Sequence, residues 1–146
     1  MCTKTLHLTK VIGLLLALGA ASPSLAQGTF YVVTQDERLG TVDVNTGVYS
    51  NIGSLGDQLT DIAVAADGSL YGVSFTDLYS INATTGVATR IGSTGQRGIN
   101  ALVFQNNTLY AASNLNTGLY TLNVGTGAAS FIGNTGFESS GDLAFD

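Results

Sequence analysis

The sequence of 146 residues has no tryptophan and only one residue each of cysteine, proline, methionine and histidine. These four residues and both lysines lie among the first 26 positions, as Cys2, Pro23, Met1, His7, Lys4 and Lys10. The rest of the chain therefore has no thiol for a disulfide, no imidazole to act as a base and no amine for a Schiff base. Ser-His-Asp and Cys-His catalysis are excluded there, and stability has to come from buried apolar surface and hydrogen-bonded sheets.

Charge is also scarce, since only 10% of the residues are charged. After position 26 the basic residues are Arg38, Arg90 and Arg97, against ten Asp and Glu. An acidic surface is repelled by a phosphate backbone. The charge balance thus argues against nucleic acid as a partner.

The first residues carry the features of a secretory signal peptide. Two lysines precede the apolar run VIGLLLALGAA, which is followed by SPSLAQ. The run is shorter than the roughly 20 residues that span a bilayer, and Ser24 and Ala26 are small enough for signal peptidase. We predict a signal peptide over residues 1–26 and a secreted or periplasmic domain over residues 27–146, free of the membrane after cleavage.

The remainder repeats with a period near 40 residues. The segments GTFYVVT, SLYGVS and TLYAAS align at Tyr31, Tyr71 and Tyr110. Each is followed by a second apolar run, a turn (NTG, TTG or GTG) and a third run that ends in Ile-Gly. A fourth run, DIAVAADG, NALVFQNN or DLAFD, begins at Asp61, Asn100 and Asp142.

Each run is short and rich in Val, Ile, Leu, Tyr and Phe, while Gly, Asn, Asp and Thr fill the gaps, so each is predicted to be a strand. The turn glycines Gly47, Gly86 and Gly127 suit hairpins that end on a residue with positive φ. Asp67-Gly68 and Asn106-Asn107 mark the next hairpin. The sequence predicts an all-β domain of three repeats, each a four-stranded antiparallel sheet.

One stretch, LYSINATTGVATRIGSTG, carries the pattern LYxIxxxTGxxxxIGxTG most fully. In this pattern the chain resembles secreted bacterial β-propeller repeat proteins, and the resemblance covers nearly all of residues 28–146. It implies β-propeller blades. Members of that group are mostly of unassigned function, so the resemblance implies a fold and not a chemistry.

The number of blades is the open question. The expected strands come in groups of three, four, four and one, which is three blades' worth, and the last segment, SGDLAFD, is what the first group lacks. It could pair beside GTFYVVT, yet propellers typically have about four to eight blades. Three alternatives follow: a homodimer that completes a six-bladed ring, a fragment of a longer propeller that stops at Asp146, or an open curved array.

The most suggestive polar set is Asp61, Asn100 and Asp142, because all three start an expected inner strand and would converge in a ring. Carboxylate and amide oxygens suit Ca²⁺, so one hypothesis is a calcium site at the channel mouth. The alternative is a structural latch, in which each side chain hydrogen-bonds the backbone of the adjacent blade.

Other motifs carry less. DVNTG at Asp43 begins like a calcium loop, but Gly47 and Ser54 occupy positions that need ligands, and a hairpin is the better interpretation. Nothing in the spacing pairs the loop carboxylates Asp36, Glu37, Asp57, Asp77 and Glu138, so no catalytic residue is assigned.

The function predicted from these observations is a secreted, non-enzymatic binding or scaffold module with an unknown protein or small-molecule ligand and no required cofactor. The first alternative is a calcium-dependent propeller hydrolase or lactonase-like enzyme with its cation on Asp61, Asn100 and Asp142. The second is a truncated propeller fragment without independent activity.

Overall fold

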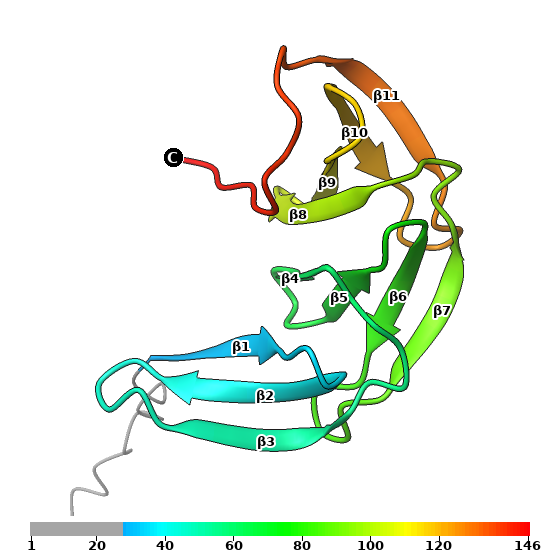
Figure 1. Ribbon diagram of the computed structural model, residues 1–146. Coiled ribbons are helices and arrows are strands. Elements are labelled where there is room, and N and C mark those ends of the chain that lie inside the picture. The colour runs from blue at the N-terminus through cyan, green and yellow to red at the C-terminus, as the bar shows by residue number, and fades with distance from the viewer. Residues whose placement is uncertain (1–27) are drawn as a thin grey trace, which may run out of the picture.

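The computed structural model describes residues 28–146, and the expected signal peptide, residues 1–26, lies outside this part. Every regular element between residues 28 and 146 is a strand, which confirms the all-β prediction (Figure 1). The strands are β1 (Thr29–Val33), β2 (Arg38–Asp43), β3 (Tyr49–Ser54), β4 (Asp61–Val64), β5 (Leu70–Val73), β6 (Asp77–Ile81), β7 (Ala88–Ser93), β8 (Ile99–Gln105), β9 (Thr108–Ser113), β10 (Gly118–Leu122) and β11 (Ala129–Asn134). In residues 28–146 there is no helix of the length and hydropathy needed to cross a membrane.

The strands form three antiparallel sheets that follow the chain. The first sheet is β1-β2-β3, the second β4-β5-β6-β7 and the third β8-β9-β10-β11. The sheets fan around one open side, with β4 and β8 nearest to it, and the fan does not close (Figure 1). The predicted four-stranded repeat is thus present in the second and third sheets.

The hairpins form because the turns have the residues that their backbones require. The turn glycines Gly47, Gly86 and Gly127 have φ of 68°, 82° and 82°, a region that costs other residues free energy. In the first of these turns the Asp43 carboxylate accepts the backbone N–H groups of Asn45 and Thr46, both at 2.9 Å. Asp43 therefore closes a hairpin, as the sequence indicated.

Apolar side chains between neighbouring sheets make two cores. One lies between the first and second sheets and includes Leu39, Leu70 and Tyr79, which are at most 4% exposed. The other lies between the second and third sheets and includes Val73 and Leu109. Because side chains alternate along a strand, the second sheet contributes to both cores, one from each face.

Glycines allow the outer edges of neighbouring sheets to touch. Gly53 in β3 meets the turn of the second sheet, where a Cβ on Gly86 would lie 2.8 Å from the Gly53 carbonyl carbon. Gly92 in β7 meets the turn of the third sheet in the same way, and a Cβ on Gly127 would lie 2.7 Å from the Gly92 carbonyl carbon. The repeated Ile-Gly and Thr-Gly pairs of the sequence thus form the contacts between sheets.

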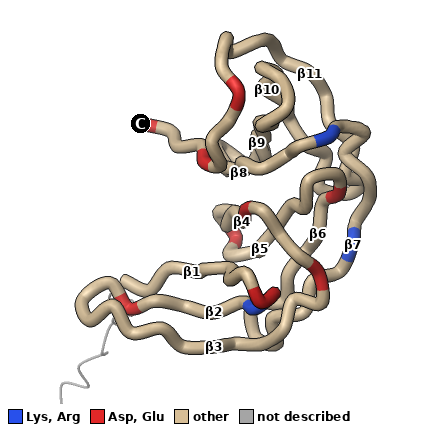
Figure 2. The backbone as a smooth tube through the Cα atoms, in the orientation of Figure 1, with Lys and Arg blue, Asp and Glu red and all other residues tan. Residues whose placement is uncertain are grey.

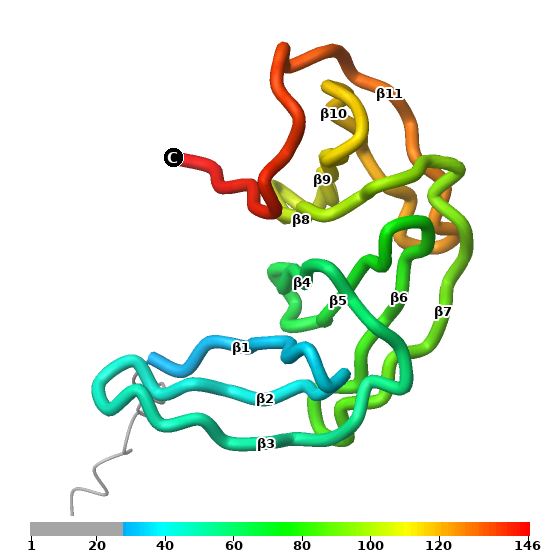
Figure 3. The backbone as a smooth tube through the Cα atoms, viewed as in Figure 1, coloured from blue at the N-terminus to red at the C-terminus, as the bar shows by residue number. Residues whose placement is uncertain are grey.

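The expected twelfth strand is not formed. Residues 141–146 have no strand partner in the described part of the chain. Figure 3 shows the C-terminal segment and β1 on opposite sides of the opening. A strand needs a paired edge, and the open fan does not bring the edge of β1 to this segment.

Candidate functional site

Asp61 joins the inner strands of two sheets. It begins β4, and its Oδ1 accepts the backbone N–H of Ile62 at 2.8 Å. Its Oδ2 accepts the backbone N–H of Leu102 in β8 at 2.6 Å. Both carboxylate oxygens therefore hold backbone donors, one of them in the next sheet. This is the bond that the latch interpretation predicted.

Asn100 makes a related bond from β8. Its Nδ2 donates to the Ser139 carbonyl at 3.2 Å, which ties the third sheet to the C-terminal segment. The side chain is only 9% exposed. Its Oδ1 is buried and accepts no hydrogen bond in the described structure, and a buried acceptor without a donor costs free energy.

Asp142 repeats part of the Asp61 arrangement. Its Oδ1 accepts the backbone N–H of Leu143 at 2.7 Å, just as Asp61 accepts that of Ile62. Asp142 is also near enough for its charge to contribute to raising the pKa of Asp61. The charge of Asp142 thus acts on Asp61, and Asn100 is tied to the residues that precede Asp142.

Burial raises the pKa of the Asp61 carboxyl from 3.8 to about 6, because the charged form loses hydration. The N–H groups of Leu102 and Ile62 lower the pKa, and the charge of Asp142 raises it further. Desolvation dominates, so Asp61 changes its charge near pH 6.

The predicted calcium site stays a prediction. In residues 28–146 no three His, Cys, Asp or Glu side chains gather closely enough to hold a metal ion. A cation between Asp61 and Asp142 would have to compete with the N–H of Leu102 for Oδ2. Asp142 accepts a backbone N–H through Oδ1 alone, and Asn100 Oδ1 is unpartnered in the described structure, so each of these residues keeps an oxygen that no backbone N–H occupies.

A cleft opens on the loop face between the second and third sheets. It has a volume of about 450 Å³ and is walled mainly by Phe75, Thr76, Arg97, Gly98, Asn114 and Leu115. An adjoining hollow of about 330 Å³ shares Phe75 and Asn114 with it and extends to Asn100 and Gly141. Phe75 is 50% exposed and Leu115 is 64% exposed, so the cleft has apolar walls open to solvent.

Two residues with an unpartnered carboxamide oxygen line these spaces: Asn114 lines both, and Asn100 lines the adjoining hollow. The Oδ1 atoms of Asn100 and Asn114 are both buried and unpartnered in the described structure. Such groups are uncommon, and each calls for a water, an ion or a ligand to satisfy it. The cleft and the adjoining hollow thus combine apolar walls with two asparagines whose Oδ1 atoms are covered from solvent and lack a donor.

Buried hydroxyl groups hold the loops in place. The Thr94 Oγ1, on a residue that is 2% exposed, donates to the Thr76 carbonyl at 2.8 Å and accepts the N–H of Gln96 at 3.1 Å. Ser113 donates to the Arg97 carbonyl at 2.8 Å and accepts the N–H of Leu115 at 3.0 Å. The cleft is thus largely preformed.

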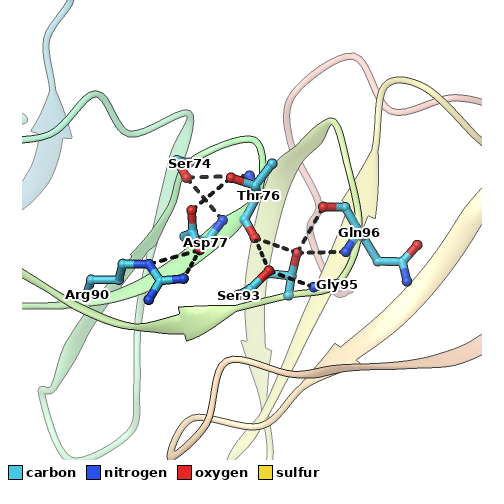
Figure 4. A network of polar contacts seen from close by, with 8 residues as sticks. Ser74, Thr76, Asp77, Arg90, Ser93, Gly95 and Gln96 are labelled. Carbon is cyan, nitrogen blue, oxygen red and sulfur yellow. Dashed lines mark hydrogen bonds and ion pairs between the residues drawn. The ribbon is translucent and has the colours of Figure 1, made fainter.

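The loop between β5 and β6 is fixed by a second set of polar contacts (Figure 4). Asp77 accepts from Arg90 Nη2 at 2.6 Å and from Thr76 Oγ1 at 2.8 Å. Ser74 Oγ accepts the N–H of Asp77 at 3.1 Å. Asp77 and Arg90, unassigned from sequence, therefore position the loop that carries Phe75.

Acidic residues outnumber basic ones in residues 28–146, and Figure 2 marks their positions along the backbone. One ion pair joins Arg38 to Asp36 at 2.9 Å, with both side chains largely exposed. The Thr34 and Arg38 side chains hold the pKa of Asp36 below its ordinary value. This pair closes the loop between β1 and β2 and is not part of the cleft.

Sequence reasoning missed Phe75, Asn114 and Leu115. They lie in the loops after the second strand of a repeat, which read QDE, FT and NLNT in the three copies. The strands repeat while these loops differ in length and composition, and loops of this kind often carry binding residues. That contrast was the one signal that could have identified them.

No protein-family model matches the sequence, and comparison with curated proteins gave no match. Among solved structures, the fold is similar to hydrazine synthase from Kuenenia stuttgartiensis, with TM-score 0.55 and 17% identity over 71% of this chain and 34% of that one. It is also similar to a protein of unknown function from Bacteroides thetaiotaomicron, with TM-score 0.54 and 20% identity over 77% of this chain and 30% of that one.

An extracellular domain from Bacteroides thetaiotaomicron matches with TM-score 0.53 and 17% identity, over 82% of this chain and 16% of that one. The chain thus spans well under two thirds of each of these proteins. At such identities the likeness concerns the fold alone. Together with the three sheets, it defines an all-β protein of β-propeller-type repeats whose sheets are not closed into a ring.

Proposed function

We propose that this chain is a secreted, non-enzymatic binding module and that its binding surface is the cleft between the second and third sheets. The proposal rests mainly on one observation, the two buried and unpartnered carboxamide oxygens of Asn114, at this cleft, and of Asn100, at the adjoining hollow. Secretion is supported by the character of residues 1–26.

The cleft favours a particular ligand chemistry. The two Oδ1 atoms accept hydrogen bonds, so a ligand has to bring N–H or O–H donors. Phe75 and Leu115 provide an apolar wall for a hydrophobic group, and Arg97 at the rim can pair with a carboxylate. A peptide segment with an apolar side chain between two main-chain N–H groups combines these features.

Titration with N-acetyl-phenylalanine amide, followed by nuclear magnetic resonance, tests this proposal. We expect saturable shifts of the Asn100 and Asn114 side-chain amide signals, and much weaker shifts with N-acetylglycine amide, which lacks the apolar group. Absence of saturable shifts with the phenylalanine probe, or equal shifts with both probes, would contradict the proposed surface. Equal or stronger shifts with glucose would point to a glycan ligand instead.

The substitution Asn114→Leu separates binding from folding. It removes the buried acceptor and keeps a similar volume. The free energy of unfolding should therefore not fall, and we expect it to increase by at most about 2 kcal/mol. Probe binding should fall at least severalfold. Urea denaturation gives the stability, and the same titration gives the affinity. A variant that binds as well as the original chain would show that Asn114 has no part in recognition.

The calcium-dependent hydrolase is the second candidate, favoured by the proximity of the Asp61 and Asp142 carboxylates. A bound cation would stabilise the fold in proportion to its concentration. We expect the melting temperature in Ca²⁺ to equal that in NaCl of the same ionic strength, because both Asp61 oxygens already accept backbone N–H groups. A rise specific to Ca²⁺ that Asp142→Asn abolishes would support the hydrolase instead.

A further inference from the structure

The two ends of the fan are complementary halves of the junction that joins its sheets. At both internal junctions a glycine of an outer strand, Gly53 or Gly92, lies against the Thr-Gly turn of the following sheet. The third glycine of this series is Gly133 in β11, and the unused turn glycine is Gly47 in the first sheet. A Cβ on either of these would meet nothing within 4 Å.

A backbone hydrogen bond accompanies each internal junction. The N–H of Ala88 donates to the Leu55 carbonyl, and the N–H of Ala129 donates to the Thr94 carbonyl, both at 3.0 Å. The repeat places Tyr49 at the donor position of the first sheet and Thr135 at the acceptor position of the third. The next junction of this kind would therefore join the Tyr49 N–H of one chain to the Thr135 carbonyl of another.

Apolar side chains are exposed at these ends where their counterparts are covered. Ile52 and Ile91 pack against the cores of the internal junctions, whereas Ile132 in β11 is 51% exposed. In the first sheet Phe30 is 50% exposed, although the residues at the same repeat position, Leu70 and Leu109, are at most 2% exposed. Each end thus exposes a position that a neighbouring sheet covers elsewhere.

The C-terminal segment already lies where the inner strand of a further sheet belongs. Phe104 of β8 packs on Tyr71 of the second sheet with ring centroids 5.5 Å apart. Phe145 packs on Tyr110 of the third sheet at 5.2 Å, in a similar tilted arrangement. Residues 142–146 are therefore held against the third sheet as β8 is held against the second.

The first sheet offers the edge that such a strand needs. The strands β5 and β9 each pair on both sides, whereas β1 pairs only with β2 among residues 28–146. An unpaired edge of backbone N–H and C=O groups is a template for a strand of another chain. In the repeat, the strand that would pair with the free edge of β1 corresponds to β4 and β8, and residues 142–146 have the same place in the repeat as these two strands.

We infer that a second copy of this chain binds across these ends, with residues 142–146 of each copy added to β1 of the other. The register of β4 with β5 gives the pairing, with Asp142 at the place of Asp61. The register of β8 with β9 agrees with it, because a bulge between Ile99 and Ala101 puts Ala101 at that place. Applied to the contact between residues 142–146 of one copy and β1 of the other, these registers give four pairs. They place Asp142 opposite the partner's Val33, Leu143 opposite the partner's Val32, Ala144 opposite the partner's Tyr31 and Phe145 opposite the partner's Phe30.

Two such contacts related by a two-fold axis use both ends of the fan that residues 28–146 form in each copy, so two copies of this part of the chain make a closed ring. Each first sheet gains the fourth strand that the other sheets have. The inference does not rest on the proposed function, because residues 142–146 and β1 do not line the cleft between the second and third sheets. Oligomeric state and probe binding are measured separately, so either proposal can fail without the other.

The molar mass of residues 27–146 in solution, measured by light scattering after size-exclusion chromatography, is the first test. We expect twice the mass of the chain. Gly133→Val should give the monomer mass with an unchanged circular dichroism spectrum, because its Cβ has no neighbour within 4 Å in its own chain and would meet the partner's turn at Thr46. Gly125→Ala, in an exposed turn away from both ends, is the control and should remain a dimer.

A monomer of the original sequence, a larger or polydisperse species, or a Gly133→Val variant that is still a dimer would each overturn the inference. The register has its own test, because residues 27–146 contain no cysteine. Chains with Val32→Cys are mixed with chains that carry Leu143→Cys and oxidised, and we expect a disulfide between the two kinds of chain. Ala144→Cys is the matched control and should not link to Val32→Cys, because neighbouring residues point to opposite faces. Equal linking of both would contradict the register.

Discussion

Gly92→Ala is expected to be one of the most destabilising single-methyl changes in the fold. A Cβ at this position would overlap the Thr126 carbonyl oxygen of the third sheet. Backbone atoms on both sides leave no flexible side chain to move, so the two sheets have to separate locally. We expect a loss of about 3 kcal/mol or more in the free energy of unfolding, at the upper end of overpacking effects.

Urea denaturation followed by circular dichroism measures this loss. Gly53→Ala should behave alike, because its Cβ would overlap the Thr85 carbonyl oxygen. Gly125→Ala is the control: its Cβ would meet only the Asn123 Oδ1, at 3.4 Å, and the change should be neutral or stabilising by up to about 1 kcal/mol. If all three variants lose the same small amount, the glycine contacts do not hold the sheets together.

The strands and turns could be predicted because local chemistry determines them. Gly86 and Gly127 recur at the same place in their repeats, and only a residue that tolerates positive φ suits that place. Asn106 and Asn107, with φ of 48° and 64°, form the two-residue hairpin that their sequence indicates. The repeat then aligned every strand, since each copy confirmed the boundaries of the others.

The prediction of a twelfth strand was wrong for the single chain, because strand pairing depends on two edges and not on one segment. The segment at Leu143 has the composition of the inner strands, and Phe145 even makes the corresponding aromatic contact. A strand forms only where an edge such as that of β1 lies beside it. Composition therefore identified the segment as strand-like, and the arrangement of the sheets leaves it without a strand to pair with.

The candidate site divides in the same way. The latch at Asp61 followed from its recurring position, and its bond to Leu102 is present. The cleft residues Phe75 and Asn114 lie where the copies differ, so the repeat gave no guide to them. Whether an amide oxygen is left without a donor depends on which backbone groups the folded loops bring next to it. The spacing of residues in the sequence does not show this.

Asp61 should make the stability of the fold depend on pH in an unusual direction. Its pKa in the folded chain is about 6, above the ordinary 3.8, so between these values the folded state binds more protons than the unfolded state. Stability then falls as pH rises through this window. The stabilisation that comes from the protonated Asp61 carboxyl is fully present below pH 3.8 and is lost above about pH 6.

Asp61→Asn removes this titration and keeps one acceptor for the backbone N–H of Leu102 or Ile62. We expect the original chain to lose about 1–2 kcal/mol relative to the variant as pH rises through the window, a figure reduced for solvent screening. Urea denaturation at a series of pH values measures the difference. Asp67→Asn is a control of opposite sign, because the Ser69 N–H and side chain hold the pKa of Asp67 below its ordinary value. Parallel pH profiles for the original chain and Asp61→Asn would show that the Asp61 carboxylate carries no desolvation cost in the fold.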